Sequence, residues 1–268
     1  MIKALLGITK EPFNHTDLPL LAQQKHIVDL VKIHAQQGGF SVIIGQPGVG
    51  KSIVREHLES FASERDTIVA SFSRTLHTYA HCLNQLADSL QLSVAANQLE
   101  KKLIQTAFDH VRQRKTLYTV IDEAHLLDMT VLRKLRLLFD QFPAKHNLVL
   151  FGQPELLYYL SLLSNADIKG RITFSHTLVP LANEAMVDAI NDQLKAVGLG
   201  ANTFNDDALE LIVRCVEGNL RLGRNLCYAS LIEACRAGKK IVTTGHVNAV
   251  LIQPHWRSHD QLIKQQTA

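Results

Sequence analysis

The stretch VIIGQPGVGKS at residues 42–52 joins a short apolar run to a glycine-rich loop that ends in Lys-Ser. It matches the pattern Gly-x-x-x-x-Gly-Lys-Ser/Thr, in which glycines let backbone N–H groups curl round phosphate oxygens. The sequence IVREHL follows directly and predicts a helix, whose positive N-terminus would also face the phosphates. A strand, a phosphate-binding loop and a helix in this order predict a parallel α/β sheet.

We expect this loop to bind the triphosphate of ATP. Lys51 would reach the β- and γ-phosphate oxygens, and the hydroxyl of Ser52 would hold Mg²⁺. The expected nucleotide-binding residues of the loop are Gly45, Gln46, Pro47, Gly48, Val49, Gly50, Lys51 and Ser52. The alternative, a glycine-rich turn without a ligand, leaves the preceding strand and the following helix unexplained.

A second motif, LYTVIDE at residues 117–123, places two carboxylates directly after an apolar run. A buried strand that ends in Asp-Glu would deliver both to the carboxyl edge of the sheet, where ligands of α/β proteins bind. We expect Asp122 to serve Mg²⁺ and Glu123 to orient and polarise the attacking water. The long gap between Ser52 and Asp122 leaves room for an intervening strand, which favours a nucleotide hydrolase over a simple nucleotide kinase.

Two further polar residues, Gln153 and Arg171, are candidates for the same site. Gln153 ends the fourth apolar run and could touch the γ-phosphate or the water, although a plain turn residue is an equal alternative. Arg171 precedes the fifth run and could reach the γ-phosphate of a neighbouring subunit, a role worth about 10³–10⁵ in rate; its alternative is a solvated loop cation. The tetrapeptide DEAH at residues 122–125 also occurs in helicases, but those need two RecA-like lobes, so we expect His125 to be structural or to support a residue that contacts the ligand.

Five apolar runs divide the first 180 residues, and helical patterns lie between them. The runs cover residues 40–44, 67–72, 117–121, 148–151 and 172–178. Because most are continuous rather than alternating, they predict strands buried on both faces of a doubly wound parallel sheet. A helical stripe over residues 131–142 leaves Arg133 and Arg136 largely off its apolar side.

Beyond Pro180 the patterns are helical only. An amphipathic stripe over residues 186–197 stops at Gly198, and a helix capped by Asn205 stops at Gly218. Further helices are predicted over about 220–237 and around 247–252. The expected domains are residues 1–180, which bind nucleotide, residues 181–253, which are helical, and a polar tail over 254–268.

The bulk composition describes an ordinary globular chain of 268 residues, with 46% hydrophobic residues and a net charge of +3. This mildly basic balance permits a nucleic-acid partner without requiring one. The four cysteines form no C-x-x-C pair, and we expect buried free thiols in a reducing compartment. No signal peptide and no apolar run long enough for a transmembrane segment is evident, so the expected location is the cytoplasm.

Taken together, these motifs resemble those of the AAA+ ATPases of the ExeA type, from LGI at residues 6–8 to about residue 252. The segments GQPEL at 152–156, RIT at 171–173 and GNLRL at 218–222 carry the resemblance beyond the two phosphate-site motifs. It implies a three-layer α/β/α P-loop NTPase (AAA+) domain followed by a small helical lid. It also implies that Gln153 is sensor 1, Arg171 the arginine finger and Arg221 the lid arginine called sensor 2. Arg224 is a rival for that last role, and Pro12-Phe13 would pack near the adenine.

The resemblance leaves the biological role open between two main alternatives. Stand-alone chains of this design resemble the ATPase partners of transposases, which include TnsC, TniB and Mu B. That likeness implies a homo-oligomeric ring or filament on double-stranded DNA that recruits or activates a transposase. Secretion members of the family instead imply a cytoplasmic ATPase that acts through secretion or pilus-assembly proteins. A nucleotide switch that barely turns over is a third possibility.

Direct signs of DNA binding are modest. Arg74 follows the second predicted strand, in a region that faces DNA in the TnsC-like relatives. Other basic spots lie at residues 101–102, 112–115 and 239–240, each of which could equally be a solvated helix face. The sole tryptophan, Trp256, could stack on a base or partner, or dock the tail. In a ring, weak phosphate contacts repeated in every subunit would sum to strong binding.

Overall fold

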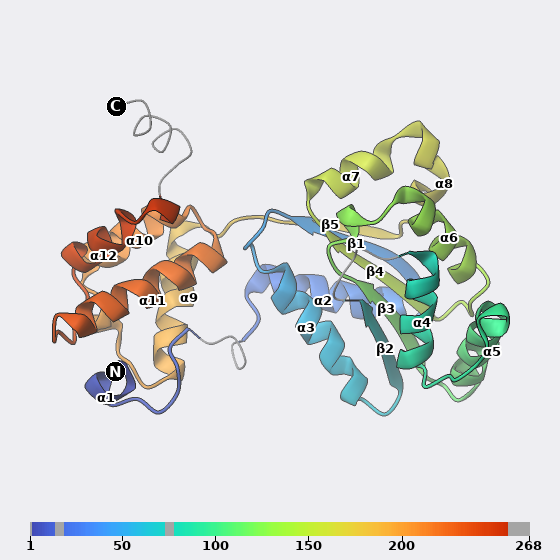
Figure 1. Ribbon diagram of the computed structural model, residues 1–268, viewed down its shortest axis with the longest axis horizontal. Helices are drawn as coiled ribbons and strands as arrows, with labels where there is room; N and C mark the ends of the chain where they lie inside the picture. Colours follow the sequence, from blue (N-terminus) through green and yellow to red (C-terminus); the bar gives the residue numbers. More distant parts are fainter. Residues whose placement is uncertain (1, 14–18, 73–77, 257–268) are drawn as a thin grey trace. The chain divides into compact units, whose positions relative to one another are not determined.

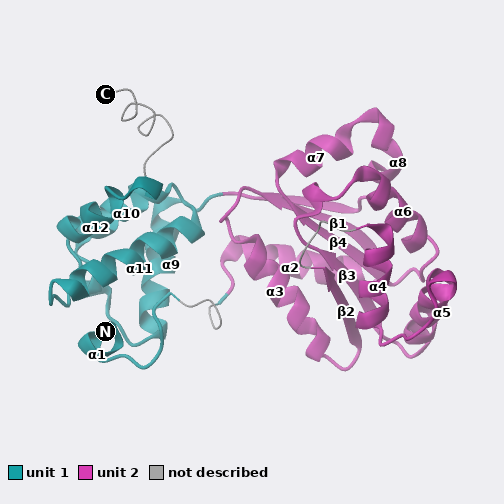
Figure 2. Cartoon of the chain, in the orientation of Figure 1, with its two compact units in different colours: residues 1–19, 180–268 teal, residues 20–179 magenta. Residues whose placement is uncertain are grey.

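The computed structural model describes residues 2–13, 19–72 and 78–256 (Figure 1). The chain forms two compact units (Figure 2). Residues 20–179 make one, the sheet unit, and residues 1–19 together with 180–268 make the other, the helical unit. Arg74 and the tail after Trp256 lie outside the described residues.

The sheet unit contains five parallel strands in the order β2-β3-β4-β1-β5. They are β1 (Gly39–Gly45), β2 (Thr67–Phe72), β3 (Thr116–Ile121), β4 (His146–Gly152) and β5 (Phe174–Leu178). All five predicted strands are therefore confirmed. β5 begins two residues later than predicted, because the N–H groups of Arg171 and Ile172 bond back to Ile168 and Lys169 in a turn.

Helices cover both faces of this sheet. Its helices are α2 (Ala22–Ala35), α3 (Lys51–Ser60), α4 (Tyr79–Ser89), α5 (Leu99–Arg112), α6 (Met129–Phe139), α7 (Pro154–Ser161) and α8 (Ala166–Lys169). Residues along β4 alternate between the two layers: Leu148 and Leu150 join the cluster under α4–α6, whereas Val149 and Phe151 join the one under α2 and α3. Burial of each such apolar side chain stabilises the folded chain by about 1.5–3 kcal/mol relative to leaving it exposed. The predicted three-layer α/β/α arrangement is confirmed.

The helical unit packs α9 (Asn183–Ala196), α10 (Asp206–Val216), α11 (Leu220–Arg236) and α12 (Thr244–Leu251) around its own core, with α1 (Ile2–Leu6) beside α11. Asn205 caps α10 as predicted, with its Oδ1 accepting from the N–H of Ala208 at 2.9 Å. Gly218 has φ of 75°, and a Cβ there would lie 2.2 Å from the carbonyl oxygen of Leu181. Only glycine fits at this close approach.

The domain limits expected from the sequence, 1–180, 181–253 and 254–268, stay predictions. Residues 254–256 form a short 3₁₀ turn. Among the described residues, no helix is both long and apolar enough to cross a membrane. The expectation of buried thiols holds for Cys82, Cys227 and Cys235, but it is wrong for Cys215, which is exposed at the end of α10.

Candidate nucleotide-binding site

The glycine loop between β1 and α3 has the backbone that a phosphate cradle needs. Gly48 and Gly50 have φ of 86° and 104°, in the left-handed region that side chains disfavour. A Cβ on Gly45 would lie 2.7 Å from Cγ2 of Val49 and 2.9 Å from the carbonyl oxygen of Leu178. The loop therefore folds back closely on the end of β1, and α3 begins directly at Lys51 with its N–H groups at the loop.

Lys51 is held at the loop by the backbone. Its side chain is buried, and Nζ donates to the carbonyl oxygens of Gly45 at 2.6 Å and Gln46 at 3.1 Å. A buried ammonium group close to the N-terminus of a helix presents positive charge where phosphate oxygens would lie. The loop, Lys51 and the start of α3 thus fit a nucleotide triphosphate.

The acidic pair follows β3 as predicted. Oδ1 of Asp122 accepts from the N–H of Glu123 at 2.8 Å, and Oδ2 lies 3.1 Å from Nε of Arg55. Burial raises the pKa of Asp122, while the Glu123 N–H and the Arg55 guanidinium pull this pKa down. Sequence analysis assigned no role to Arg55, although its position four residues after Lys51 on a helix puts both on one face.

The Arg55 contact brings the two phosphate-site motifs together. Arg55 lies on α3 one turn beyond Ser52, so the Ser52 hydroxyl shares that face of the helix nearer the loop. Hydroxyl and carboxylate oxygens are the ligands that Mg²⁺ prefers. Ser52 and Asp122 therefore fit the ion, which when bound would neutralise phosphate charge.

Glu123 occupies a strained position at the start of the 3₁₀ turn η4 (Ala124–Leu126). Its φ and ψ are 49° and 35°, a left-handed conformation that costs a non-glycine residue about 1–2 kcal/mol. The side chain is 42% exposed, so the carboxylate is open to solvent. His125, in the same turn, places Nε2 3.5 Å from Oε2 of Glu123.

Gln153 follows β4, and β4 lies between β1 and β3. Gly152 pairs in register with Ile44, next to the glycine loop, while Ile121 of β3 pairs with Leu150. Gln153 thus lies at the sheet edge between the loop and the acidic pair. Its N–H donates to Nδ1 of His125 at 3.4 Å.

Arg171 lies at the opposite end of the strands, near the start of β1. The next residue but one, Thr173, donates its N–H to the carbonyl of Phe40 near the start of β1, whereas the glycine loop follows the end of β1. A strand of seven residues spans about 20 Å. Arg171 is therefore too far to reach a phosphate on its own loop, and a role in a neighbouring subunit's site stays a prediction.

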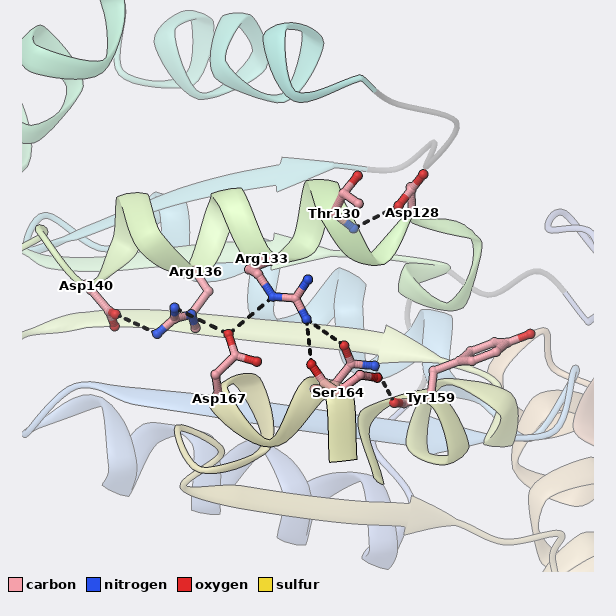
Figure 3. A network of polar contacts seen from close by, with 9 residues as sticks. Asp128, Thr130, Arg133, Arg136, Asp140, Tyr159, Ser164 and Asp167 are labelled. Atoms are coloured by element: carbon pink, nitrogen blue, oxygen red, sulfur yellow. Dashed lines mark hydrogen bonds and ion pairs between the residues drawn. The ribbon is translucent and has the colours of Figure 1, made fainter. Parts of the chain in front are cut away.

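A chain of alternating charges leads from Arg133 to Arg171, and Figure 3 shows it as far as Asp140. Arg133 and Arg136 of α6 both contact Oδ2 of Asp167 on α8, at 3.3 and 3.4 Å. Arg136 also donates to Asp140 at 3.0 Å, and Asp140 lies 3.5 Å from Nη2 of Arg171. The side chain of Arg136 is only 13% exposed, and its two carboxylate partners are Asp140 and Asp167.

The two lid-arginine candidates lie on α11 of the helical unit. Asn219 caps this helix with Oδ1 accepting from the N–H of Leu222 at 3.1 Å. Arg221 is exposed, and Arg224 is half-buried at the edge of a cavity of about 280 Å³. The cavity is lined by Glu11, Pro12, Phe13, Arg224, Asn225 and Tyr228. The sensor 2 and adenine roles stay predictions.

Comparison with known proteins agrees with this geometry. Residues 33–160 match the family described as AAA domain. This region of the chain is therefore similar to AAA domains. Such a domain binds ATP, typically with Mg²⁺, and implies nucleoside-triphosphatase activity. No curated protein matches the chain.

Solved structures share the AAA+ P-loop fold at low sequence identity. Cdc6p from Pyrobaculum aerophilum aligns with a TM-score of 0.67 and 19% identity, over 88% of this chain and 68% of that one. ORC2 from Aeropyrum pernix aligns with a TM-score of 0.68 and 15% identity, over 91% and 72%. Drosophila ORC, solved bound to DNA, aligns with a TM-score of 0.62 and 19% identity, over 96% and 73%. These matches establish the fold of the AAA domain, and the ExeA-type resemblance stays a prediction.

Proposed function

We propose that this chain binds ATP with Mg²⁺ and hydrolyses it at the sheet edge formed by the ends of β1, β3 and β4. One observation carries the proposal: Arg55, on the helix that starts at the glycine loop, contacts Asp122 at 3.1 Å. The phosphate loop and the acidic pair therefore belong to one site. Two such motifs on separate sides of the sheet could not act on one nucleotide.

The residues divide the chemistry between them. Lys51 offers a buried positive charge to the phosphates, and Asp122 with Ser52 would hold the metal ion. Glu123 has a carboxylate that is open to solvent and can orient a water for attack. Gln153 lies between these groups, where it can contact the γ-phosphate or the water.

We further propose that the ATPase serves DNA transposition, by assembling on double-stranded DNA as a homo-oligomer and recruiting or activating a transposase. The resemblance to TnsC, TniB and Mu B supports this role. Among the structures that share the fold, Drosophila ORC and Aeropyrum pernix ORC1 were solved with DNA. The position of Arg171, too far from its own loop, favours an assembly in which each subunit contributes an arginine to the next.

ATP hydrolysis is tested by steady-state phosphate release. The wild-type chain should turn over ATP only with Mg²⁺, and Glu123→Gln should bind ATP but lose about 10²–10⁴ in rate. Glu184→Gln, at an exposed position in the first turn of α9, is the matched control and should keep the wild-type rate. Normal turnover by Glu123→Gln would exclude that residue as the catalytic carboxylate.

The transposition role is tested by fluorescence anisotropy with random-sequence duplex DNA. Glu123→Gln loaded with ATP should bind DNA, bind less without nucleotide, and lose affinity steeply between about 50 and 200 mM salt. Salt-insensitive behaviour, or no binding at all, would contradict the DNA role. Co-purification with membrane or pilus proteins in place of DNA binding would favour the secretion alternative.

A further inference from the structure

His125 bridges two segments of the proposed site. It belongs to η4, and its side chain is 10% exposed. One ring nitrogen, Nδ1, lies 3.4 Å from the N–H of Gln153, and the other, Nε2, lies 3.5 Å from Oε2 of Glu123. A single imidazole therefore contacts both the residue that follows β4 and the carboxylate proposed to orient water.

The direction of these contacts follows from the backbone. An amide N–H can only donate, so Nδ1 of His125 must accept and carries no hydrogen. In a neutral imidazole the hydrogen then resides on Nε2, the nitrogen that faces Glu123. The ring is thus set to donate toward the carboxylate, and the peptide group at Gln153 determines this tautomer.

The backbone around His125 is closely packed. The turn of η4 is closed by the N–H of Leu126, which donates to the carbonyl of Glu123 at 2.9 Å. A Cβ on Gly152 would lie 2.7 Å from Leu156 and 3.5 Å from the backbone nitrogen of His125. The end of β4 and η4 therefore approach closely, and glycine at 152 permits it.

We propose that His125 is a positioning residue, which couples the orientation of the Glu123 carboxylate to the backbone at Gln153. The proposal rests on the proposed ATPase function. Any nucleotide that shifts the segment at Gln153 would act on the carboxylate through this one side chain. If His125 only filled space, the hydrogen-bonding groups of its two ring nitrogens would not affect activity. Variants that keep or remove these groups therefore test the proposal.

Three substitutions separate the two roles. His125→Gln keeps one acceptor and one donor on a side chain long enough to reach toward Glu123. His125→Asn keeps both groups on a shorter side chain that stays near Gln153, and His125→Leu has neither group. Leu126→Ala, at a 52% exposed position in the same turn, is the matched control for disturbance of η4.

The experiment measures kcat, KM, ATP affinity and the thermal midpoint of each variant. We expect kcat of the Leu and Asn variants to fall by about tenfold or more, because a misdirected base loses part of its 10²–10⁴ contribution. KM and ATP affinity should stay within about threefold, since binding is not what His125 governs. The Gln variant should recover kcat to within about threefold of wild type, and Leu126→Ala should match wild type.

Two results would overturn the proposal: wild-type kcat in His125→Leu, or equally low kcat in the folded Gln and Leu variants. If the Leu variant fails to fold, the comparison of Gln with Asn decides in the same way. Failure of the proposed function looks different, because the wild-type chain itself would then release no phosphate. If the wild-type chain hydrolyses ATP, Glu123→Gln is inactive and His125→Leu is unaffected, the proposed coupling is wrong and the proposed ATPase function stands.

Discussion

Nε of Arg55 lies 3.1 Å from Oδ2 of Asp122, and this contact links the helix after the glycine loop to the end of β3. Both side chains are largely buried, with 16% and 13% exposed. Arg55 also donates to Glu59 at 2.7 Å, so its guanidinium lies between two carboxylates. Burial raises the pKa of Asp122, and the positive charge of Arg55 opposes this rise.

Removal of this charge should destabilise the chain. We expect Arg55→Met to lower the free energy of unfolding by about 1–3 kcal/mol near neutral pH, because a buried carboxylate loses its nearest cation. Urea unfolding measures the change. Arg112→Met is the control: Arg112 is 79% exposed in its pair with Asp109, and its loss should cost less than about 0.5 kcal/mol. Equal stability of wild type and Arg55→Met would contradict the proposed role of the pair.

Lys51→Ala should lower ATP affinity by at least about tenfold. The variant loses a buried ammonium group, and hydrogen bonds to charged partners are worth about 1.5–3 kcal/mol each. Calorimetric titration with ATP and Mg²⁺ measures the affinity, and a thermal melt shows that the variant is folded. Lys101→Ala, exposed on α5, should bind ATP like wild type. Retained affinity in Lys51→Ala would mean that the phosphates lie elsewhere.

Arg171 should act in trans if it acts on ATP at all. Arg171→Ala alone should hydrolyse ATP at least about 10³-fold more slowly. A mixture with Glu123→Gln should regain activity, because some interfaces then combine an intact Glu123 with an intact Arg171. Phosphate release across mixing ratios measures this rescue. The absence of any rescue, with both variants still assembling, would argue against a role between subunits.

His146 should make the chain sensitive to acid. It is buried beside Phe139 and Phe142, with Nε2 2.9 Å from Oγ1 of Thr119, and burial lowers its pKa from 6.5 to about 3. Between these values the unfolded chain binds a proton that the folded chain does not. As the pH is lowered below about 6.5, the free energy of unfolding should therefore decrease, by up to about 1.4 kcal/mol per pH unit.

His146→Gln removes this titration and should flatten the dependence. Urea unfolding at about pH 7, 5.5 and 4.5 gives the slope of the free energy of unfolding against pH for wild type and for His146→Gln. The carboxylates contribute equally to both slopes, so the difference reports His146. His255→Gln, at an exposed position, should leave the wild-type slope unchanged. Identical slopes for wild type and His146→Gln would show that the histidine charges without cost in the folded chain.

The sequence alone determined the parts of this protein that depend on contiguous residues. The glycine loop could be predicted because its φ values and its close turns are properties of neighbouring residues, as at Gly50. The strands β1, β3 and β4 could be predicted because burial on both faces demands continuous apolar runs. The cap at Asn205 could be predicted because its hydrogen bond joins residues only three positions apart, so the local sequence is enough to indicate it.

Which of these parts come into contact depends on how the whole chain packs. The insertion of β4 between β1 and β3 sets Gln153 beside the acidic pair, and no local pattern specifies the order of strands. The same packing pairs Arg55 with Asp122 and Arg136 with Asp167 of α8, although the local sequence predicts an ordinary helix-surface position for both arginines. The local sequence determines a side chain's charge and the face of the helix on which it lies. Its partner depends on how segments distant in the sequence pack together.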